Sequence, residues 1–483
     1  GATRYELWRR ASESGTWLKV QDRPAAATYT IIAVSAHLLD WRGARWRVDA
    51  CDASGCTPSA EVSATSLMRD SVGFIKPVPE LPPRRFGMAM ALSADGRTLA
   101  VLGAEFWTNI SLLPYVYVYR RVGSNWVFDA RLASDNAREN DNVGTSVALN
   151  SDGSVLVWGT QFTPYPNDTG GTVFRGAVYV FRRVAGAWQR DHKVTAPNEQ
   201  TMYLGRDVDV SDDGERFVAS YQSLPYRMGH TQIYHRVSGA WQLEKTLTMR
   251  TSGSHWAECI GLALSGNGQR VARYCTRSPH SPALAGKFVE TYSAPRWTLE
   301  AEIQLGSHIH YPDFLRVIGA IDISGDGTRL VSMHSHESTL SVWRWNGSAW
   351  EADSPAGALA ELTTPGLSVA MSRNGNLIVQ GDEHDVTVGV GAIYPPYQVG
   401  VASTGIARVY ERRGGTWTLR QMIKGNSPAS AAYYRQGFGS TVALGDNGSV
   451  LAVGAESNSS AATGVDGDQD DISAPYSGAA WLY

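Results

Sequence analysis

The sequence predicts an all-β protein built from repeated four-stranded units. Short apolar runs with period-two alternation recur along most of the 483 residues, as is typical of strands with one buried face. In each repeat the first two runs flank an Asp-Gly or Asn-Gly pair, which is the strongest short-range signal for a β-hairpin. Seven such pairs occur, at residues 95–96, 152–153, 213–214, 267–268, 326–327, 374–375 and 447–448. Four strands per repeat, with seven repeats, predict a seven-bladed β-propeller.

The clearest repeat covers residues 86–132, where two alternating runs flank the turn and a Val/Tyr run follows. Its fourth run opens on a tryptophan, and the other complete repeats have a tryptophan at the same place. These residues are Trp126, Trp188, Trp241, Trp297, Trp350 and Trp417. A large aromatic side chain at this position is expected to fill the space between neighbouring blades.

The last repeat, residues 437–483, contains only three predicted strands. Residues 70–76 match the pattern of residues 418–425, the outer strand of the sixth repeat. We therefore expect residues 70–76 to supply the missing strand and to close the ring, which would leave no open sheet edge at the seam. On this interpretation the propeller domain comprises residues 66–483.

Residues 1–65 form a different region, for which five short strands are predicted. They cover residues 3–11, 16–22, 28–34, 44–52 and 59–65. The run from Arg4 to Cys56 resembles the second half of a fibronectin type III domain of bacterial secreted proteins, with Trp46 where that family usually has a tyrosine. The resemblance implies a partial β-sandwich that lacks two strands. Either upstream sequence completes this sandwich, or a strand from a partner or neighbouring subunit does, which would give self-assembly through this module.

The net charge of −3 favours neither a nucleic-acid partner nor an anionic membrane surface. No apolar run approaches the roughly 20 residues of a membrane span. The four cysteines form two pairs, Cys51 with Cys56 and Cys259 with Cys275, and each pair is expected to face across antiparallel strands. Two disulfides would favour an extracellular, cell-surface or periplasmic location. Four buried free thiols are the alternative.

The repeats resemble FG-GAP repeats, the blades of integrin-α-like propellers and of many bacterial surface proteins. The resemblance rests on the Phe-Gly openings at 86–87 and 438–439, the Gly-Ala that ends strand two, and residues 176–183. Integrin-type blades often bind Ca²⁺ in an acidic loop between strands one and two. The corresponding turns here carry too few carboxylates for the six to eight oxygen ligands of Ca²⁺. Only the loop with Asp466, Asp468 and Asp470 is densely acidic, and both a solvated loop and a Ca²⁺ site are consistent with its pattern.

No catalytic motif is present in the sequence. The loops that join strand two to strand three, and each blade to the next, hold eight of the 11 histidines, all on one face of the predicted propeller. These are His230, His255, His280, His308, His310, His334, His336 and His384. The same loops carry the aromatic residues Trp107, Tyr165, Tyr226, Trp256, Tyr311, Tyr394, Tyr397 and Tyr476.

Three interpretations of this loop face stay open. The residues have no joint function, or they form a recognition surface for a glycan or a protein. The third interpretation is a metal site, because alternating histidines on a strand project to the same side. Its candidate ligands are His308, His310, His334 and His336, assisted by Asp313 and Glu337.

The sequence thus favours a secreted or cell-surface protein with a non-catalytic binding or adhesion function, for which a subunit of a surface assembly is one form. The alternative is a propeller enzyme that acts on polysaccharide through the histidine-rich loop face. No resident cofactor is predicted apart from Ca²⁺ in the acidic loop.

Overall fold

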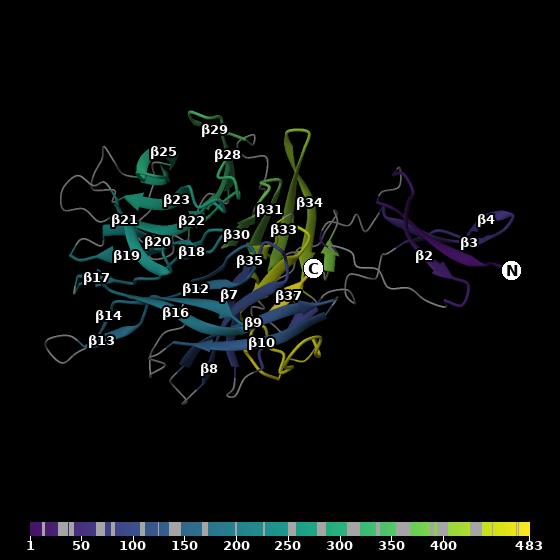
Figure 1. Cartoon of the computed structure of the whole chain (residues 1–483), viewed down its shortest axis with the longest axis horizontal. Helices are drawn as coiled ribbons and strands as arrows, with labels where there is room; N and C mark the ends of the chain where they lie inside the picture. Colours follow the sequence, from purple (N-terminus) through teal and green to yellow (C-terminus); the bar gives the residue numbers. More distant parts are fainter. Residues whose placement is uncertain are drawn as a thin grey trace.

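The structure is a computed structural model of the 483-residue chain. It describes residues 1–11, 15–27, 37, 43–63, 73–78, 83–106, 112–123, 125–134, 146–166, 172–198, 200–225, 228–249, 257–277, 286–306, 319–334, 339–353, 368–386, 391–393, 404–425, 437–446, 448–469, 471 and 473–483. The regular structure in these ranges consists of β-strands (Figure 1). The described chain contains no helix long and apolar enough to cross a membrane.

Each predicted repeat corresponds to a group of antiparallel strands, which we call units 1 to 7. Unit 1 has β7 (Pro83–Leu92), β8 (Thr98–Phe106), β9 (Leu112–Val122) and β10 (Asn125–Ala133). Unit 2 has β11 (Ser146–Leu149), β12 (Val155–Thr160), β15 (Ala177–Val184) and β16 (Ala187–Thr195), with a separate hairpin of β13 (Pro164–Pro166) and β14 (Thr172–Phe174). Unit 3 has β18 (Val208–Val210), β19 (Arg216–Ser223), β20 (Met228–Val237) and β21 (Ala240–Thr248), and β17 (Thr201–Met202) pairs with β19.

Unit 4 has β22 (Ala257–Leu264), β23 (Arg270–Arg277), β24 (Gly286–Ser293) and β25 (Thr298–Gly306). One parallel pairing, Met228 with Ala257, connects it to unit 3. Unit 5 has β26 (Gly319–Ile323), β27 (Arg329–His334), β28 (Thr339–Trp345) and β29 (Trp350–Ala352). Unit 6 has β30 (Ser368–Met371), β31 (Leu377–Asp382), β33 (Ile406–Arg413) and β34 (Thr416–Lys424), with β32 (Gly391–Ile393) on β34.

Unit 7 combines strands from both ends of the chain. Three of them are β35 (Phe438–Leu444), β36 (Leu451–Ala455) and β37 (Ala479–Leu482). The fourth is β6 (Gly73–Ile75), which pairs antiparallel with β37 and places Phe74 opposite Trp481. This is the position predicted from the sequence for the strand supplied by residues 70–76, of which residues 70–72 lie outside the described ranges.

The turns between the first two strands of the units differ from the two-residue turns that the sequence predicted. In unit 1 the Ser93 amide bonds to the Thr98 carbonyl at 2.9 Å, so four residues form the turn. Only Gly96 has a positive φ, 66°, because the Gly96 amide returns to the Ser93 carbonyl and closes a type I turn. The Asp95 carboxylate accepts hydrogen bonds from the Ser93 hydroxyl at 2.6 Å and the Arg97 amide at 2.9 Å. The aspartate therefore stabilises the turn from within.

Successive turns are also joined to one another by backbone hydrogen bonds. The Ser151 amide of unit 2 donates to the Asp212 carbonyl of unit 3 at 3.2 Å, and four further bonds of this kind run from unit 1 to unit 2 and from unit 3 through unit 6. The Asp446 amide of unit 7 donates to the Ala94 carbonyl of unit 1 at 2.6 Å. The first and last units are therefore neighbours.

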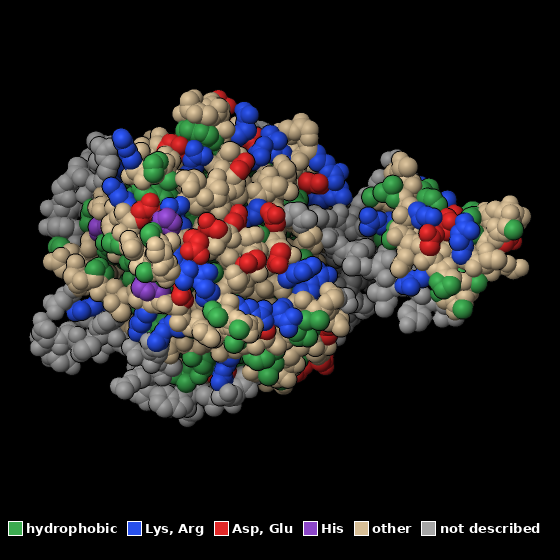
Figure 2. All heavy atoms as spheres, viewed as in Figure 1, with side chains coloured by type: hydrophobic (Ala, Val, Ile, Leu, Met, Phe, Trp, Pro, Cys, Tyr) green, Lys and Arg blue, Asp and Glu red, His purple; other side chains and the backbone are tan. Residues whose placement is uncertain are grey.

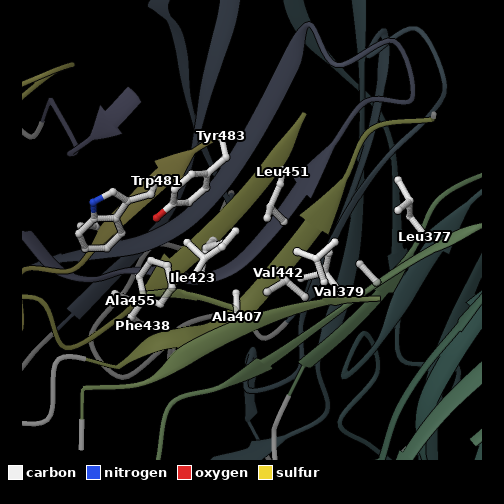
Figure 3. Close-up of a cluster of buried hydrophobic side chains, with 14 of the residues drawn as sticks. Leu377, Val379, Ala407, Ile423, Phe438, Val442, Leu451, Ala455, Trp481 and Tyr483 are labelled. Carbon is white, nitrogen blue, oxygen red and sulfur yellow. The ribbon is translucent and has the colours of Figure 1, made fainter. Parts of the chain in front are cut away.

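The apolar core is divided among the junctions between units. Seven clusters of buried side chains each combine residues of two consecutive units, and one of them joins unit 7 to unit 1. Figure 3 shows the cluster between units 6 and 7, where Val379 and Ile423 face Phe438, Val442 and Trp481. Because alternate residues of every inner strand face a neighbouring unit, both faces of each sheet are buried.

The six tryptophans contact the preceding unit, as predicted. Trp126, Trp297 and Trp417 belong to these junction clusters, while Trp188, Trp241 and Trp350 are partly buried against them. Four of the indoles also donate a hydrogen bond across the junction, to Asp129, Asp191, Thr291 and Asp353. The tryptophans therefore orient each unit as well as fill space.

The N-terminal region forms one sheet in the order β2-β1-β3-β4, with β5 on β3. The strands are β1 (Arg4–Arg10), β2 (Leu18–Pro24), β3 (Arg45–Asp52), β4 (Gly55–Pro58) and β5 (Val62–Ser63). Strand β4 was not among the five strands predicted from alternation, although the expected pairing of Cys51 with Cys56 across antiparallel strands implied it. The predicted strand at 28–34 lies outside the described residues, so a second sandwich layer stays a prediction.

Candidate binding site in the axial cavity

A cavity of about 590 Å³ lies where the first strands of all seven units converge. Met88, Met90 and Leu92 of β7 form part of its apolar wall, and β11, β18, β22, β26, β30 and β35 supply the rest. Figure 2 shows Asp and Glu side chains near the middle of the larger body, with Lys and Arg side chains around them. A hollow formed by seven separate strands offers a concave surface that no single unit could provide.

Polar side chains in the cavity wall connect a first strand to the next one at four junctions. Asp209 Oδ2 accepts a hydrogen bond from the Leu264 amide at 2.7 Å, and Asp322 Oδ2 accepts one from the Met371 amide, also at 2.7 Å. Serine hydroxyls have the same role at two other junctions. Ser146 Oγ accepts from the Val208 amide and Ser368 Oγ from the Val442 amide, both at 3.0 Å. These residues hold the wall of the cavity together.

Burial changes the ionisation of the cavity carboxylates. Desolvation is the largest cause in each case, and it raises the pKa of Asp207 and of Asp322 to about 7. It also raises the pKa of Asp209, although Arg373 opposes that shift. Asp207 accepts a hydrogen bond from the Ser146 hydroxyl at 3.0 Å, which favours its charged form. Part of the negative charge in the cavity therefore appears only as the pH rises toward 7.

Charged residues line both ends of the cavity. Glu383 follows β31, Glu456 follows β36 and Arg206 precedes β18, so the antiparallel topology places all three at one end. Arg206 contacts Glu258 at 3.4 Å, and Glu456 contacts Arg85 at 3.5 Å. Arg373 follows β30 and lies at the opposite end, where it pairs with Asp212 at 3.0 Å. Carboxylates outnumber guanidinium groups along the lining, so a ligand with positive charge would be favoured.

Most residues of the predicted histidine face lie outside the described ranges. These are Trp107, Tyr226, His255, Trp256, His280, His308, His310, Tyr311, His336, Tyr394 and Tyr397, together with Asp313 and Glu337. His334 is the last residue of β27, and only its backbone is described. His384 is described, follows the cavity residue Glu383 and lies 3.8 Å from its carboxylate. The recognition surface and the histidine metal site both stay predictions.

His230, from the same predicted face, is held by its neighbours. Its ring stacks on Tyr221 with centroids 4.6 Å apart, and its two nitrogens lie 2.7 Å from Ser223 Oγ and 3.1 Å from Thr248 Oγ1. Burial, followed by the charge of Arg273, lowers the pKa of His230 to about 4. Because both ring nitrogens already have hydrogen-bond partners, this arrangement stabilises unit 3 and leaves no nitrogen for a metal.

The acidic loop of unit 7 packs on the strand supplied by the N-terminal segment. Asp466 Oδ1 accepts a hydrogen bond from the Phe74 amide at 3.1 Å, and the Asp466 amide donates to the Phe74 carbonyl at 2.7 Å. Asp468 uses its backbone carbonyl to accept from Ser460 at 2.6 Å, while Asp470 lies outside the described residues. Asp466 thus has a structural function, and Ca²⁺ binding by the loop stays a prediction.

Two disulfides join the predicted cysteine pairs, Cys51 to Cys56 and Cys259 to Cys275. Each pair occupies directly opposite positions on antiparallel strands, as the sequence pattern indicated. Within the described ranges, groups of three potential metal ligands occur only beside these disulfides, with Glu6 and with Glu290. Because the sulfurs are bonded to each other, neither group offers thiolate ligands.

Sequence reasoning missed the aspartates of the cavity wall. Asp209 and Asp322 each stand between two apolar residues of a first strand, two positions before the serine that opens the turn. A carboxylate at a position that should be buried was the available signal. The partner amide, however, belongs to the next unit, so the local sequence does not reveal it.

Similarity to one solved structure supports the fold. The chain is similar to the β-propeller domain of Cps50 (Swd1) from Myceliophteria thermophila, with a TM-score of 0.50 and 10% identity over 82% of this chain and 96% of that one. The main body is a β-propeller. Weaker likenesses include Chaetomium thermophilum Sqt1 bound to the N-terminus of ribosomal protein L10 (TM-score 0.46, 13% identity, 79% of this chain and 95% of that one). Another is the periplasmic gluconolactonase PpgL of Pseudomonas aeruginosa (TM-score 0.43, 13% identity, 87% and 96%).

No protein-family model matches the sequence, and no curated protein matches it either. The resemblance to FG-GAP repeats and the resemblance of residues 1–65 to a fibronectin type III module therefore stay predictions.

Proposed function

We propose that the seven units are the blades of one closed ring and that β6 completes the last blade. Support comes from the pairing of β6 with β37 and from the hydrogen bond between Asp446 and Ala94. The junction cluster that combines Ile75 and Leu482 with Phe86 and Tyr117 also supports it. A closed ring would protect every sheet edge at the seam.

We propose that this ring is a non-catalytic binding scaffold that acts outside the cytoplasm, at the cell surface, in secreted form or in the periplasm. The location is supported by the two disulfides, which persist in oxidising compartments. An adhesive role, and a place in a surface assembly built through the N-terminal module, follow from the family resemblances and belong to this proposal.

The observation that carries the binding function is the axial cavity. The cavity combines apolar walls with Glu383 and Glu456 at one end. His384 follows Glu383 in the loop after β31. A basic side chain from a partner protein, or a glycan with an amino group, fits this charge and this volume. Asp209 and Asp322 are hydrogen bonded to backbone amides, and Glu456 pairs with Arg85. The cavity arginines Arg206 and Arg373 pair with carboxylates, so these charged groups form a preorganised surface.

A screen of the purified chain against a glycan array and a displayed peptide library tests this function. Ligands found there would be titrated against the double variant Glu383→Gln, Glu456→Gln, which keeps side-chain shape and removes both charges. We expect affinity to fall at least tenfold, because each lost charge pair contributes roughly 1 kcal/mol or more. Glu244→Gln, on outer strand β21, is the matched control and should bind normally. If the double variant bound the ligand as tightly as the Glu244→Gln control, the ligand would bind elsewhere on the protein. Release of shortened glycan would support the enzymatic alternative.

A further inference from the structure

Lys76 is a buried cation at the end of the strand that the N-terminal segment contributes to unit 7. Its side chain is fully buried. Its ammonium nitrogen donates to Ser477 Oγ at 2.7 Å, to Asn458 Oδ1 at 3.4 Å and to the Gly478 carbonyl. All three acceptors are neutral. They satisfy the N–H groups of the amine without offsetting the cost of burying its charge.

Unit 6 contains the equivalent lysine with a different partner. Lys424 is the last residue of β34, and Lys76 directly follows β6, so the two lysines have corresponding positions. The side-chain nitrogen of Lys424 lies 3.0 Å from the buried carboxylate of Asp385. Asp385 stands four residues after Gly381, and Asn458 stands four residues after the corresponding Gly454. At this position unit 6 thus has a carboxylate, which Arg408 shares at 2.6 Å, and unit 7 has an amide. Burial lowers the pKa of Lys424 too, but Asp385 opposes that shift.

The groups that surround Lys76 on other elements do not replace that carboxylate. Asp471 attracts the lysine through space, but its oxygens accept hydrogen bonds from the Ala461 and Ser473 amides. The Tyr119 hydroxyl, from β9, donates to the Lys76 carbonyl at 2.7 Å, and burial raises the pKa of Tyr119 so that it stays neutral. Asp466 is bound to the Phe74 amide. Burial consequently lowers the pKa of Lys76 to about 7, against an ordinary value of 10.5.

We propose that Lys76 makes the attachment of β6 to the last unit sensitive to pH between neutral and mildly alkaline conditions, with protonation of the buried amine loosening the strand. An opened strand would expose the amine to water, where it holds its proton up to its ordinary pKa. Between about pH 7 and pH 10 the open state therefore binds one more proton than the closed state. The closed state gains stability as the pH rises through this window, and the full cost of the buried charge is present below it.

Hydrogen exchange of the intact protein measures this opening. The amides of Phe74 and Lys76 are hydrogen bonded to the 464–466 loop, so they exchange when β6 detaches. Protection factors, corrected for the intrinsic pH dependence of exchange, should rise up to about tenfold per pH unit between pH 7.5 and 9.5. Wild-type protection that stays constant across this range would overturn the proposal.

Two variants isolate the amine. Lys76→Met removes the titrating group and should give protection that does not change with pH, whereas a slope equal to that of the wild type would contradict the assignment. Asn458→Asp supplies the carboxylate that unit 6 has at Asp385, and it should raise protection at pH 7 and shift the slope to higher pH. This second variant keeps the lysine, so it tests the proposal even where Lys76→Met fails to fold.

The matched control is Asp385→Asn in unit 6, which gives Lys424 the same neutral acceptor that Lys76 has. It should extend the pH dependence of protection at the end of β34 to lower pH, because Asp385 no longer opposes the lowered pKa of Lys424, and it should leave β6 unchanged. If the pH dependence at the end of β34 did not change, the difference between Asp385 and Asn458 would not set the response and the proposal would be wrong.

Discussion

The indole N–H of Trp417 donates to Asp353 Oδ2 at 3.2 Å, across the junction between units 5 and 6. The same carboxylate also pairs with Arg412 at 2.9 Å and with Arg329 at 3.3 Å. An equivalent arrangement joins Asp129 to Trp188 and Arg183 between units 1 and 2. One acidic side chain thus fixes the tryptophan and the arginine of the following unit in a single geometry.

Asp353→Ala should lower the free energy of unfolding by about 2–3 kcal/mol, because it leaves an indole and two guanidinium groups without their acceptor. Thermal or urea unfolding of the full chain measures the loss. Asp22→Ala is the control, since Asp22 is more than half exposed and pairs with Lys19 on the surface at 3.2 Å. That variant should lose less than about 1 kcal/mol, and equal losses would argue against the junction as the source.

Phe74→Ala should destabilise unit 7 by about 3–5 kcal/mol, because the buried ring packs on Trp481 at a centroid distance of 5.1 Å. Deletion of residues 1–77 removes the whole of β6 and should lower the melting temperature further. Deletion of residues 1–66 leaves β6 in place and serves as the control. Identical melting temperatures for the two truncations would refute the closing role of this strand.

Asp322→Asn should change the pH dependence of stability in a defined direction. Burial raises the pKa of Asp322 to about 7 in the folded protein, against an ordinary 3.8, so the folded state binds the extra proton between these values. The contribution of Asp322 to stability therefore decreases as pH rises from about 4 to 7 and is constant above 7. The difference in unfolding free energy between wild type and variant should fall by at least about 1 kcal/mol over that range.

The control for this titration is Asp326→Asn in the adjacent turn. Burial opposes ionisation there, but hydrogen bonds from Ser324 and Thr328 outweigh it and lower the pKa of Asp326. Asp326 is therefore ionised in both the folded and the unfolded protein above about pH 5. The difference in unfolding free energy between wild type and this variant should be constant from pH 5 to 7. A slope of the same size in both variants would show that the effect does not come from Asp322.

Replacing Cys259 and Cys275 together by alanine should lower the stability of the propeller by about 2–4 kcal/mol, because the disulfide closes a 16-residue segment. Calorimetry of the oxidised protein provides the measurement. The matched double variant at Cys51 and Cys56 alters only the N-terminal sheet and should leave the main transition in place. Free thiols at all four positions in protein isolated without reductant would exclude both bonds.

The sequence by itself determined most of the strands, the positions of the turns and the repeat, because these depend on contacts within a few residues. Alternation placed the apolar faces, and the seven turn pairs marked where neighbouring strands meet. It also indicated both disulfides, since each bond crosses one hairpin. The predicted turn length of two residues was wrong. The Asp95 and Ser93 side chains accept hydrogen bonds from the Arg97 and Thr98 amides, which would pair with the neighbouring strand in a two-residue turn.

Only the tertiary structure decided which residues of different units contact one another. The cavity forms because seven first strands from distant parts of the chain converge, and Asp322 finds the Met371 amide 49 residues away in sequence. In the same way, Asn458 meets Lys76 only after β6 joins β37, across 382 residues. Burial and charge at these positions depend on long-range packing, which local sequence patterns do not encode, and it is there that the candidate site and the pH-sensitive strand arise.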